Sequence, residues 1–504
     1  MADFWTRRAF LAATAVTGVA GVAGCATSSN AGSSSASSTG YQPTNKWHIP
    51  SKQLAKASLI DAYAGSTSVL PGQPVSLYVS SAADSWTLDV YRIGNYAGLG
   101  GAKIASAGPF PGKQQGPPKQ DSKTRAMSAP WTVSTQLDTA GWPEGLYLLR
   151  VNAKGLSRHV PLIVRSTSAV GKVAYVGAAA TWQAYNIWGG RSLYGNEQVN
   201  FAERSYAVSF DRPYDDKGIG LLHAFEVPLA RVADESAVPL AWFANTDIDQ
   251  HPELLNGAIA VVSPGHDEYW SVPHRDAMTK ARDAGANLTF FGANGSYWRV
   301  RASDTATGPG RLITCYKSAA LDPVQGPSTT ARWRDKPDPR PENEMIGQMY
   351  DAYPVQGPLT IRDPDFFLFA GTGVSQGSQL DGLLGPETDR YYPNADAQHP
   401  TQLPALSDVT CNGKKSWSTA SYYTTPSGSG VFATGTMAWT RALPRPILIP
   451  GATHATVRFT HAVTLNTFAA LASGPLGKSH PAKDDAGSAS LPNHNTSGAA
   501  ADSD

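Results

Sequence analysis

The sequence predicts an all-β domain, a β-sandwich, followed by an α/β domain built on a mostly parallel sheet. Two observations lead to this fold class. Between residues 57 and 165, short runs alternate apolar and polar side chains and are separated by Gly- and Pro-rich turns, which is typical of half-buried antiparallel strands. After residue 168 the apolar runs become continuous and alternate with a helical stretch, as in parallel strands that are buried on both faces.

The β-sandwich domain is expected over residues 46–167. Residues 100–128 are rich in Gly, Pro, Lys and Gln and are predicted to form a long loop. The alternating runs that we expect to be strands are residues 75–79, 86–91, 131–133, 145–151 and 160–164.

The α/β domain is expected over residues 168–475. In open parallel sheets, ligands bind at the carboxyl ends of the strands, so the residues that follow these strands are the candidates for a functional site. The expected strands are residues 172–177, 240–244, 258–263 and 287–291, with a helix over residues 273–284 between the last two.

The first 25 residues have the pattern of an export signal. Arg7 and Arg8 precede an apolar run of about 12 residues, too short for a membrane span, which needs roughly 20. This start resembles a twin-arginine signal, and the tetrad ending in Cys25 resembles a lipidation site. We therefore expect export by the twin-arginine translocase and a lipid anchor on Cys25, with the protein periplasmic or on the cell surface. Residues 26–45 are expected to be a flexible Ser-rich linker, and residues 476–504 a disordered tail.

The net charge and the absence of common catalytic motifs narrow the classes of function that the chain can have. A formal net charge of +1 gives no electrostatic case for binding nucleic acid. The sequence has no Gly-x-Ser-x-Gly elbow, phosphate-binding loop or HExxH motif. Beyond Cys25 the cysteines are Cys315 and Cys411, and whether they form a disulfide stays open.

Chemically useful residues follow the third and fourth strands of the predicted sheet. The third strand ends in Gly265-His266-Asp267-Glu268-Tyr269-Trp270, and the fourth is followed by Asn294. Helix capping by one acid is the simpler explanation of the first turn, and a left-handed turn is the simpler explanation of Asn294. Capping does not account for a histidine, two acids and two aromatic residues together.

Two aromatic loops add candidate ligands. The first covers residues 181–194 and contains Tyr185 and Tyr194, and the second covers residues 209–214 and ends in Tyr214. Tyrosinate and carboxylate oxygens would suit a hard cation such as Fe(III), although the choice among iron, manganese and zinc stays open. Packing of aromatic side chains over the sheet is the alternative for any single tyrosine.

These motifs together resemble the large-subunit family of N,N-dimethylformamidase. The likeness covers most of residues 57–440, and as a set the motifs are specific. They are 181–190 (TWQAYNIWGG), 209–214 (SFDRPY), 265–270 (GHDEYW), 292–299 (GANGSYWR), 315–317 (CYK), 333–335 (WRD), 340–343 (RPEN), 371–373 (GTG) and 422–428 (YYTTPSG).

The resemblance implies an α/β domain of the glutamine-amidotransferase type and an iron held by two tyrosines and a glutamate. The glutamate would be Glu268 and the first tyrosine Tyr185. The second would be Tyr214, with Tyr194 as the alternative. His266, Asn294, Lys317 and Glu387 would be catalytic, and Tyr423 and Trp270 would line the substrate pocket. The formamidase itself has Pro where this chain has Asp267, and it pairs with a small subunit.

The expected function is metal-assisted hydrolysis of an amide C–N bond in an unidentified small substrate. His266 would act as general base or acid, and Asn294 and Lys317 would stabilise the oxyanion. The sequence leaves two alternatives open: a surface lipoprotein that binds glycan or envelope polymer without catalysis, and a metal-free hydrolase that uses His266 with Glu268. Self-association into a homo-oligomer also stays open.

Overall fold

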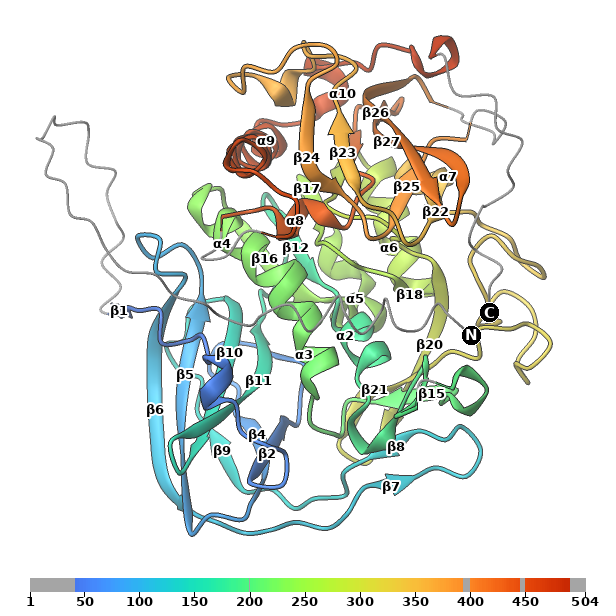
Figure 1. The fold of residues 1–504 in the computed structure, drawn as a ribbon. Helices are drawn as coiled ribbons and strands as arrows, with labels where there is room; N and C mark the ends of the chain where they lie inside the picture. The colour runs from blue at the N-terminus through green and yellow to red at the C-terminus, as the bar shows by residue number, and fades with distance from the viewer. Residues whose placement is uncertain (1–40, 199, 393–398, 445–448, 490–504) are drawn as a thin grey trace, which may run out of the picture.

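The computed structural model describes residues 41–489 except residue 199 and residues 393–398 and 445–448 (Figure 1). Its N-terminal part consists of two sheets that enclose one hydrophobic cluster. In the strand β4 every second side chain is buried, so one face of the smaller sheet faces this cluster. The larger sheet contains, in spatial order, β1 (Gln42–Pro43), β6 (Gly101–Pro111), β5 (Ser85–Ile93), β10 (Gly145–Ala153), β11 (Leu156–Val164) and β3 (Ser68–Val69), and the smaller sheet contains β2 (Ile60–Ala64), β4 (Val75–Ser81) and β9 (Thr135–Leu137).

The N-terminal part differs from the sequence prediction in three places. The predicted loop over residues 100–128 contains the long strand β6, whose small and half-exposed side chains give no clear alternating pattern. Residues 131–133 are not a strand, and the pairing with β4 is made by β9 instead. Residues 42 and 43, which fall in the predicted flexible linker, form β1 and pair with β6.

The central sheet of the second part has seven strands. Its first five strands are parallel, and β27 and β26 complete it in antiparallel pairing. All four strands predicted for this part are present, so the expected order of a β-rich part followed by a mixed α/β part is confirmed. The likeness to glutamine-amidotransferase domains stays a prediction. The strands are, in spatial order, β16 (Leu240–Ala244), β12 (Val173–Gly177), β17 (Ala260–Ser263), β19 (Asn287–Phe290), β28 (Gly430–Ala433), β27 (Lys414–Thr424) and β26 (Thr401–Cys411).

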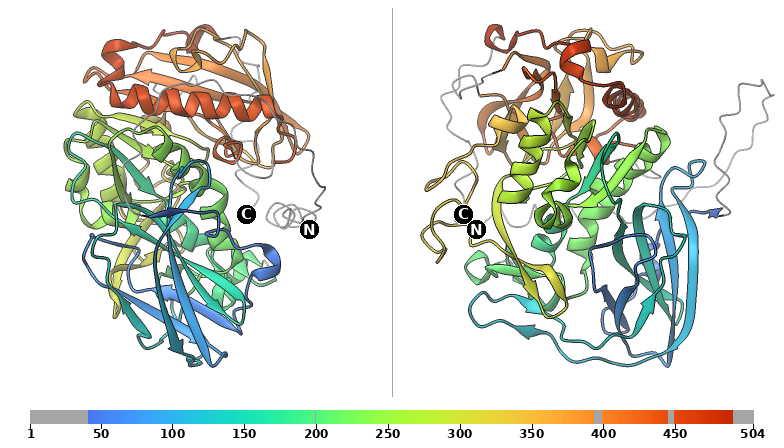
Figure 2. Two further views of the ribbon diagram at one scale, coloured as in Figure 1. Left: turned by 90° about the vertical axis from the view of Figure 1, so that its left-hand side faces the viewer. Right: turned by 180° about the vertical axis from the view of Figure 1, so that it is seen from behind.

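Helices pack around this sheet. The predicted helix 273–284 is α6, in which Ser271 caps the first turn by accepting from the His274 N–H. Figure 2 shows the long helix α9 beside the C-terminal strands, where it also contacts α4. The helices are α2 (Ala179–Tyr185), α3 (Asp216–Leu221), α4 (Val227–Glu235), α5 (Asn245–Gln250), α6 (Val272–Asp283), α7 (Asn343–Ile346), α8 (Ala438–Arg441), α9 (His454–Ala472) and α10 (Leu476–Ser479).

Smaller elements complete the fold. A four-stranded sheet lies next to the central one, and in it β18 pairs in parallel with β20, so that Tyr269 faces Trp298. This sheet contains β15 (Ala207–Ser209), β21 (Gly308–Thr314), β20 (Trp298–Thr305) and β18 (Tyr269–Ser271). The remaining strands pair as β7 (Lys119–Gln120) with β8 (Met127–Ser128), β13 (Arg191–Ser192) with β14 (Gly195–Asn196), β22 (Met349–Ala352) with β25 (Thr388–Arg390), and β23 (Gly357–Thr360) with β24 (Gln379–Leu384). Short helical turns are η1 (Ser51–Gln53), η2 (Trp188–Gly190), η3 (Phe201–Glu203), η4 (Leu222–Glu226), η5 (Pro252–Leu255), η6 (Phe367–Phe369) and η7 (Ala486–Ser488).

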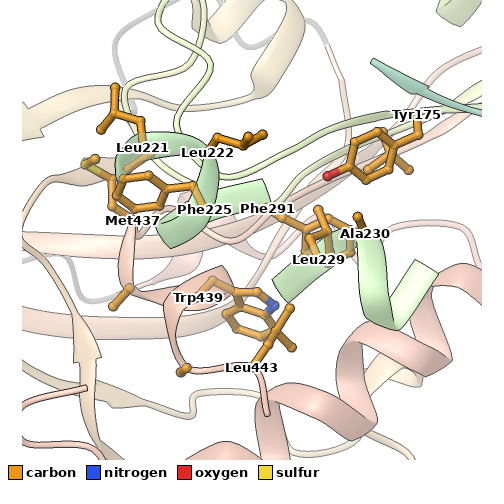
Figure 3. Close-up of a cluster of buried hydrophobic side chains, with 14 of the residues drawn as sticks. Tyr175, Leu221, Leu222, Phe225, Leu229, Ala230, Phe291, Met437, Trp439 and Leu443 are labelled. Carbon is orange, nitrogen blue, oxygen red and sulfur yellow. The ribbon is translucent and has the colours of Figure 1, made fainter. Parts of the chain in front are cut away.

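A buried hydrophobic cluster lies where helical segments meet the end of the central sheet (Figure 3). Phe225, in the π-helical turn η4, packs here with Phe291, which directly follows β19, and with Trp439 of α8. A Cβ atom added to Gly265 would lie 2.5 Å from the Cβ of Phe225. The cluster therefore packs directly against the turn that follows β17.

The C-terminal segment is ordered further than the sequence predicts. Residues 476–489, which fall in the predicted disordered tail, include α10 and η7. Leu476 is buried, and the side-chain oxygen of Asn287 accepts hydrogen bonds from the N–H groups of both Leu476 and Gly430, each at 3.0 Å. One apolar anchor and one amide thus fix this segment to the sheet. The predicted signal, Cys25 and residues 26–40 of the linker lie outside the described residues.

None of the described helices combines the length and the apolar character that crossing a bilayer requires.

Two glycines allow the turns after β17 and β19 to touch. A Cβ atom on Gly292 would lie 1.5 Å from the carbonyl oxygen of Gly265, whose own φ is 47°. The replacement Gly292→Ala should therefore force the two turns apart and lower the free energy of unfolding by about 1–3 kcal/mol, as overpacking does. Urea denaturation measures this change. Gly116→Ala is the control, since nothing lies within 4 Å of its added Cβ, and equal midpoints for both variants would contradict the prediction.

Candidate active site

Polar side chains from separate segments meet at the carboxyl end of the central sheet. Tyr185 is the last residue of α2, which follows β12, while His266 and Glu268 lie in the turn after β17. Asn294 lies in the turn after β19. The structure thus brings together these four residues at the sheet edge where the sequence placed them, and their chemical roles stay a prediction.

The carboxylate of Glu268 is the centre of this group. Tyr185 donates a hydrogen bond to Oε2 at 2.8 Å, and Tyr194, between β13 and β14, donates to Oε1 at 2.6 Å. The Nε2 atom of His266 lies 3.2 Å from Glu268 Oε2 and 3.1 Å from the Tyr185 oxygen. The two tyrosine rings are 4.3 Å apart between centroids. Two phenols and an imidazole therefore converge on one carboxylate that is 2 % exposed.

Main-chain contacts fix Glu268 in place. Its N–H donates to the Thr181 hydroxyl of α2 at 3.1 Å, and its carbonyl accepts from the N–H groups of Tyr297 and Trp298, each at 2.9 Å. The turn after β17 is thereby joined both to α2 and to the start of β20. Glu268 cannot move without disturbing the helix that carries Tyr185.

Asn294 is held by two acids from one short segment. Its backbone has a φ of 58°, a left-handed conformation that asparagine adopts more readily than most residues. The N–H of Asn294 donates to Asp389 at 2.8 Å, and its side-chain amide donates to Glu387 at 2.8 Å, with Glu268 Oε1 at 3.5 Å. Glu387 and Asp389, at β25, therefore aim the amide at the carboxylate centre.

Burial and close charges set the protonation of the group. Burial raises the pKa of a carboxyl, but the hydrogen bond and charge of His266 and the charge of Lys317 outweigh it and lower the pKa of Glu268. Burial lowers the pKa of His266, yet its hydrogen bond to Glu268 and the charges of Glu268 and Glu387 raise it overall. Burial and the charge of Glu268 raise the pKa of Tyr194 well above its usual value. Both phenols are thus donors to an ionised Glu268.

The ammonium group of Lys317 lies over the ring of Tyr194. Its ammonium nitrogen lies 3.4 Å from the centre of that ring, 4.6 Å from the centre of Trp298 and 5.3 Å from that of Tyr269. The side chain is buried, and its backbone has a φ of 58°, which is unusual for a lysine.

Three predicted site residues lie elsewhere. Tyr214 interacts with Gln183, and its carbonyl accepts a hydrogen bond from Arg158 at 2.8 Å. Trp270 stacks on His274 with ring centres 4.0 Å apart, and Tyr423 stacks on His399 at 5.0 Å. Trp270 and Tyr423 belong to one hydrophobic cluster of the core. Tyr194, the alternative to Tyr214, is therefore the tyrosine that contacts Glu268 beside Tyr185, and the roles of Trp270 and Tyr423 in a substrate pocket stay a prediction.

One supporting residue gave no signal in the sequence. Glu226, the last residue of the π-helical turn η4, accepts hydrogen bonds from the Ala178 N–H at 3.0 Å and from the Trp182 indole at 2.5 Å. Burial raises the pKa of Glu226 well above its usual value. This acid holds the start of α2 and so orients the helix that ends at Tyr185. A π-turn, which is frequent at functional sites, cannot be read from residue order.

The donor set suits a hard cation. Within the described part of the chain, no group of three or more His, Cys, Asp or Glu side chains is arranged to hold a metal ion. The cluster around Glu268 is of another kind, because two of its donors are phenol oxygens. Their protons point at the carboxylate, and a cation bound between these oxygens would replace those protons. The residues present therefore fit a metal bound by oxygen.

Both described cysteines are free thiols. Cys315 lies 3.7 Å from the Arg299 carbonyl, whereas Cys411 donates to the Tyr353 carbonyl at 3.0 Å. Their different surroundings answer the open question of a disulfide: the structure contains none between them.

The chain matches a protein-family model over most of its length. The family model described as "N,N-dimethylformamidase beta subunit-like, C-terminal" matches residues 87–454, which include each residue of the cluster. None of the curated proteins compared with the chain matches it.

The native thiols should resist alkylation. Burial raises the pKa of Cys315 to about 12, and Cys411 is also buried with a raised pKa, so neither is a reactive thiolate at neutral pH. Iodoacetamide should modify neither residue in the native protein and should modify both after unfolding in roughly 8 M urea. Mass spectrometry of the labelled protein measures the modification. Rapid labelling of native Cys315 would contradict this prediction.

Proposed function

Because the chain belongs to the N,N-dimethylformamidase beta subunit-like family, we propose that it is a hydrolase that cleaves an amide C–N bond with the help of a metal ion. The convergence of Tyr185 and Tyr194 on the buried carboxylate of Glu268 is the observation that carries this proposal. The substrate is a small amide-type molecule whose identity stays open.

The proposed cofactor is Fe(III), held by the oxygens of Tyr185, Tyr194 and Glu268. When bound, it would polarise an amide carbonyl or acidify a water molecule. Phenolate and carboxylate oxygens are hard ligands. Two phenolates and one carboxylate carry three negative charges, as many as a trivalent ion carries positive ones. The hardness and the charge of the donors therefore support iron(III).

The other residues supply proton transfer and charge stabilisation. His266 touches both Tyr185 and Glu268 and is the proposed base that takes a proton from the attacking water. The new C–O bond then forms, the C–N bond breaks, and His266 returns the proton to the departing amine nitrogen. Asn294 donates one amide hydrogen to Glu387 in the structure, and its second amide hydrogen can donate to the oxyanion. Glu387 keeps that amide in position.

Export completes the proposal. Arg7, Arg8 and Cys25 support translocation by the twin-arginine translocase and a lipid anchor at the cell envelope. This route carries folded proteins, which suits a cofactor held by residues from several segments.

The binding-protein alternative is not favoured. The family match points to a hydrolase, and a surface that binds polymer has no need of four polar groups around one buried carboxylate. The remaining alternative is a metal-free hydrolase that uses His266 and Glu268, and a measurement of metal content distinguishes it from the proposed enzyme.

Metal content is the first measurement. The purified chain should contain about one iron per chain and show a visible tyrosinate-to-iron absorption band. Glu268→Gln removes one ligand charge and should lower both iron content and amidase activity by at least about tenfold. Glu253→Gln, whose side chain is 64 % exposed, is the matched control. An active Glu268→Gln protein, or an active protein that survives chelation without metal, would contradict the proposal.

The two candidate tyrosines can be separated by paired variants. Tyr194→Phe removes the phenol that donates to Glu268 and should abolish part of the visible band and weaken iron binding. Tyr214→Phe should leave band and iron content as in the wild type, because Tyr214 lies beside Gln183. Both variants are compared by elemental analysis and absorption spectroscopy. The reverse result would restore Tyr214 as the ligand.

A further inference from the structure

We propose that Lys317 is a positioning residue whose charge, held against the Tyr194 ring, makes the two tyrosine ligands electronically different. This inference rests on the proposed function, since it concerns the phenolate form that Tyr194 takes when it binds a cation. The starting observation is the position of the ammonium, 3.4 Å from the centre of the Tyr194 ring. At this distance a cation interacts directly with the π-system of the ring.

The ammonium is held in a three-sided aromatic cage, which we define as the rings of Tyr194, Trp298 and Tyr269. Tyr269 and Trp298 are paired residues of the parallel strands β18 and β20, so their spacing is fixed by backbone hydrogen bonds. Tyr194 closes the third side from the β13–β14 hairpin. Two of the rings come from paired strands and the third from a short hairpin turn, so the cage is part of the sheet structure.

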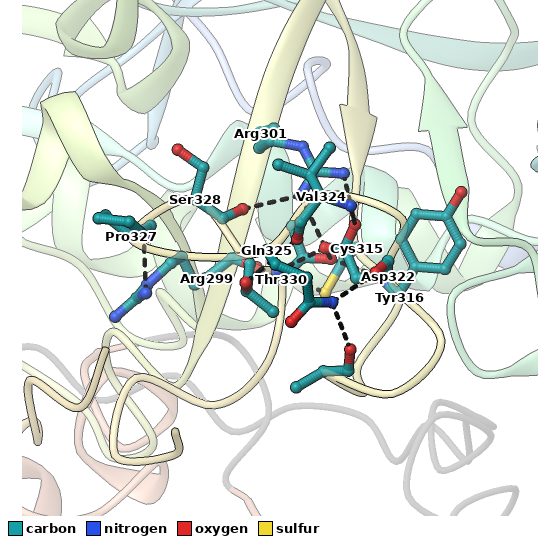
Figure 4. Close-up of polar contacts among 12 residues, drawn as sticks. Arg299, Arg301, Cys315, Tyr316, Asp322, Val324, Gln325, Pro327, Ser328 and Thr330 are labelled. Atoms are coloured by element: carbon teal, nitrogen blue, oxygen red, sulfur yellow. Dashed lines mark hydrogen bonds and ion pairs between the residues drawn. The ribbon is translucent and has the colours of Figure 1, made fainter. Parts of the chain in front are cut away.

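The backbone of Lys317 is kept in an unfavourable conformation to reach this cage. Its φ of 58° lies in the left-handed region, where a non-glycine residue is strained. Such strain persists only where the surroundings determine the backbone. Figure 4 shows these surroundings: Asp322 accepts two hydrogen bonds from Arg301, at 2.6 and 2.9 Å, and two from Thr330, at 2.6 and 2.7 Å.

The same hydrogen-bond network holds the segment that precedes Lys317. The Tyr316 N–H donates to the Thr330 hydroxyl at 2.9 Å, and the Cys315 N–H donates to the Tyr206 carbonyl at 2.8 Å. Hydrogen bonds from their N–H groups thus hold both residues that precede Lys317. The network fixes the backbone next to Lys317 and hence the direction of its side chain. The cage fixes the position of the ammonium group.

The consequence is an asymmetry between the two phenols. Tyr185 contacts the face of Tyr194 with ring centres 4.3 Å apart and lies next to His266, whereas the ammonium lies over Tyr194. A positive charge close to a phenolate ring lowers the energy of its electrons. Charge transfer from Tyr194 to the metal then needs more energy than it would without Lys317.

The replacement Lys317→Met, which keeps the length but removes the charge, tests this inference in the iron-loaded protein. We expect the visible charge-transfer band to move to longer wavelength and the iron reduction potential to fall. Lys317→Arg keeps the charge and should hold both values near those of the wild type. Lys280→Met, on the exposed face of α6, is the control for loss of a lysine elsewhere.

The outcomes separate this inference from the proposed function. An unmoved band in Lys317→Met protein that contains iron would overturn the inference and leave the metal site intact. Loss of iron from Lys317→Met but not from Lys317→Arg would support the need for the charge, whereas loss from both would show that Lys317 serves only packing. A wild-type protein without iron would overturn the proposed function, and the inference with it.

Discussion

The burial of the Glu268 carboxylate is the constraint on which the candidate site depends. A buried carboxylate without partners costs several kcal/mol, so the fold must surround it with donors and positive charge. It does so with two phenols, an imidazole and a nearby ammonium. These groups come from separate parts of the chain, and each is fixed by contacts of its own. Several loops at this edge of the sheet therefore contribute partners to one buried carboxylate.

This organisation explains why supporting residues matter as much as the contacting ones. Glu226 orients α2, Asp389 fixes the backbone of Asn294, and Asp322 fixes the segment before Lys317. Each of these acids accepts hydrogen bonds from main-chain N–H groups or from side chains, and these bonds fix its position. A site assembled in this way is preorganised, because the orientation of each group is settled before substrate binds.

Much of the fold could be predicted from the sequence, because the strands β12, β16, β17 and β19 are continuous apolar runs. The strand β6 was missed since its half-exposed side chains resemble a loop. In the site, the rule that ligands bind at strand ends selected His266, Glu268 and Asn294. It could not choose between Tyr194 and Tyr214, since both lie in aromatic loops and only the path of the backbone decides which ring reaches Glu268. The sequence also could not show that Trp270 and Tyr423 share one buried hydrophobic cluster, because their packing depends on segments far apart in the chain.

The place of β28 in the central sheet has a consequence for biosynthesis. This strand, near the end of the described chain, lies between β19 and β27, so the middle of the sheet is completed only after about 140 residues have followed β19, a long delay in contact formation. A nascent chain that has already emerged through Phe290 exposes an unpaired edge until then, and such edges invite aggregation. The protein should accordingly depend on chaperones while it is made.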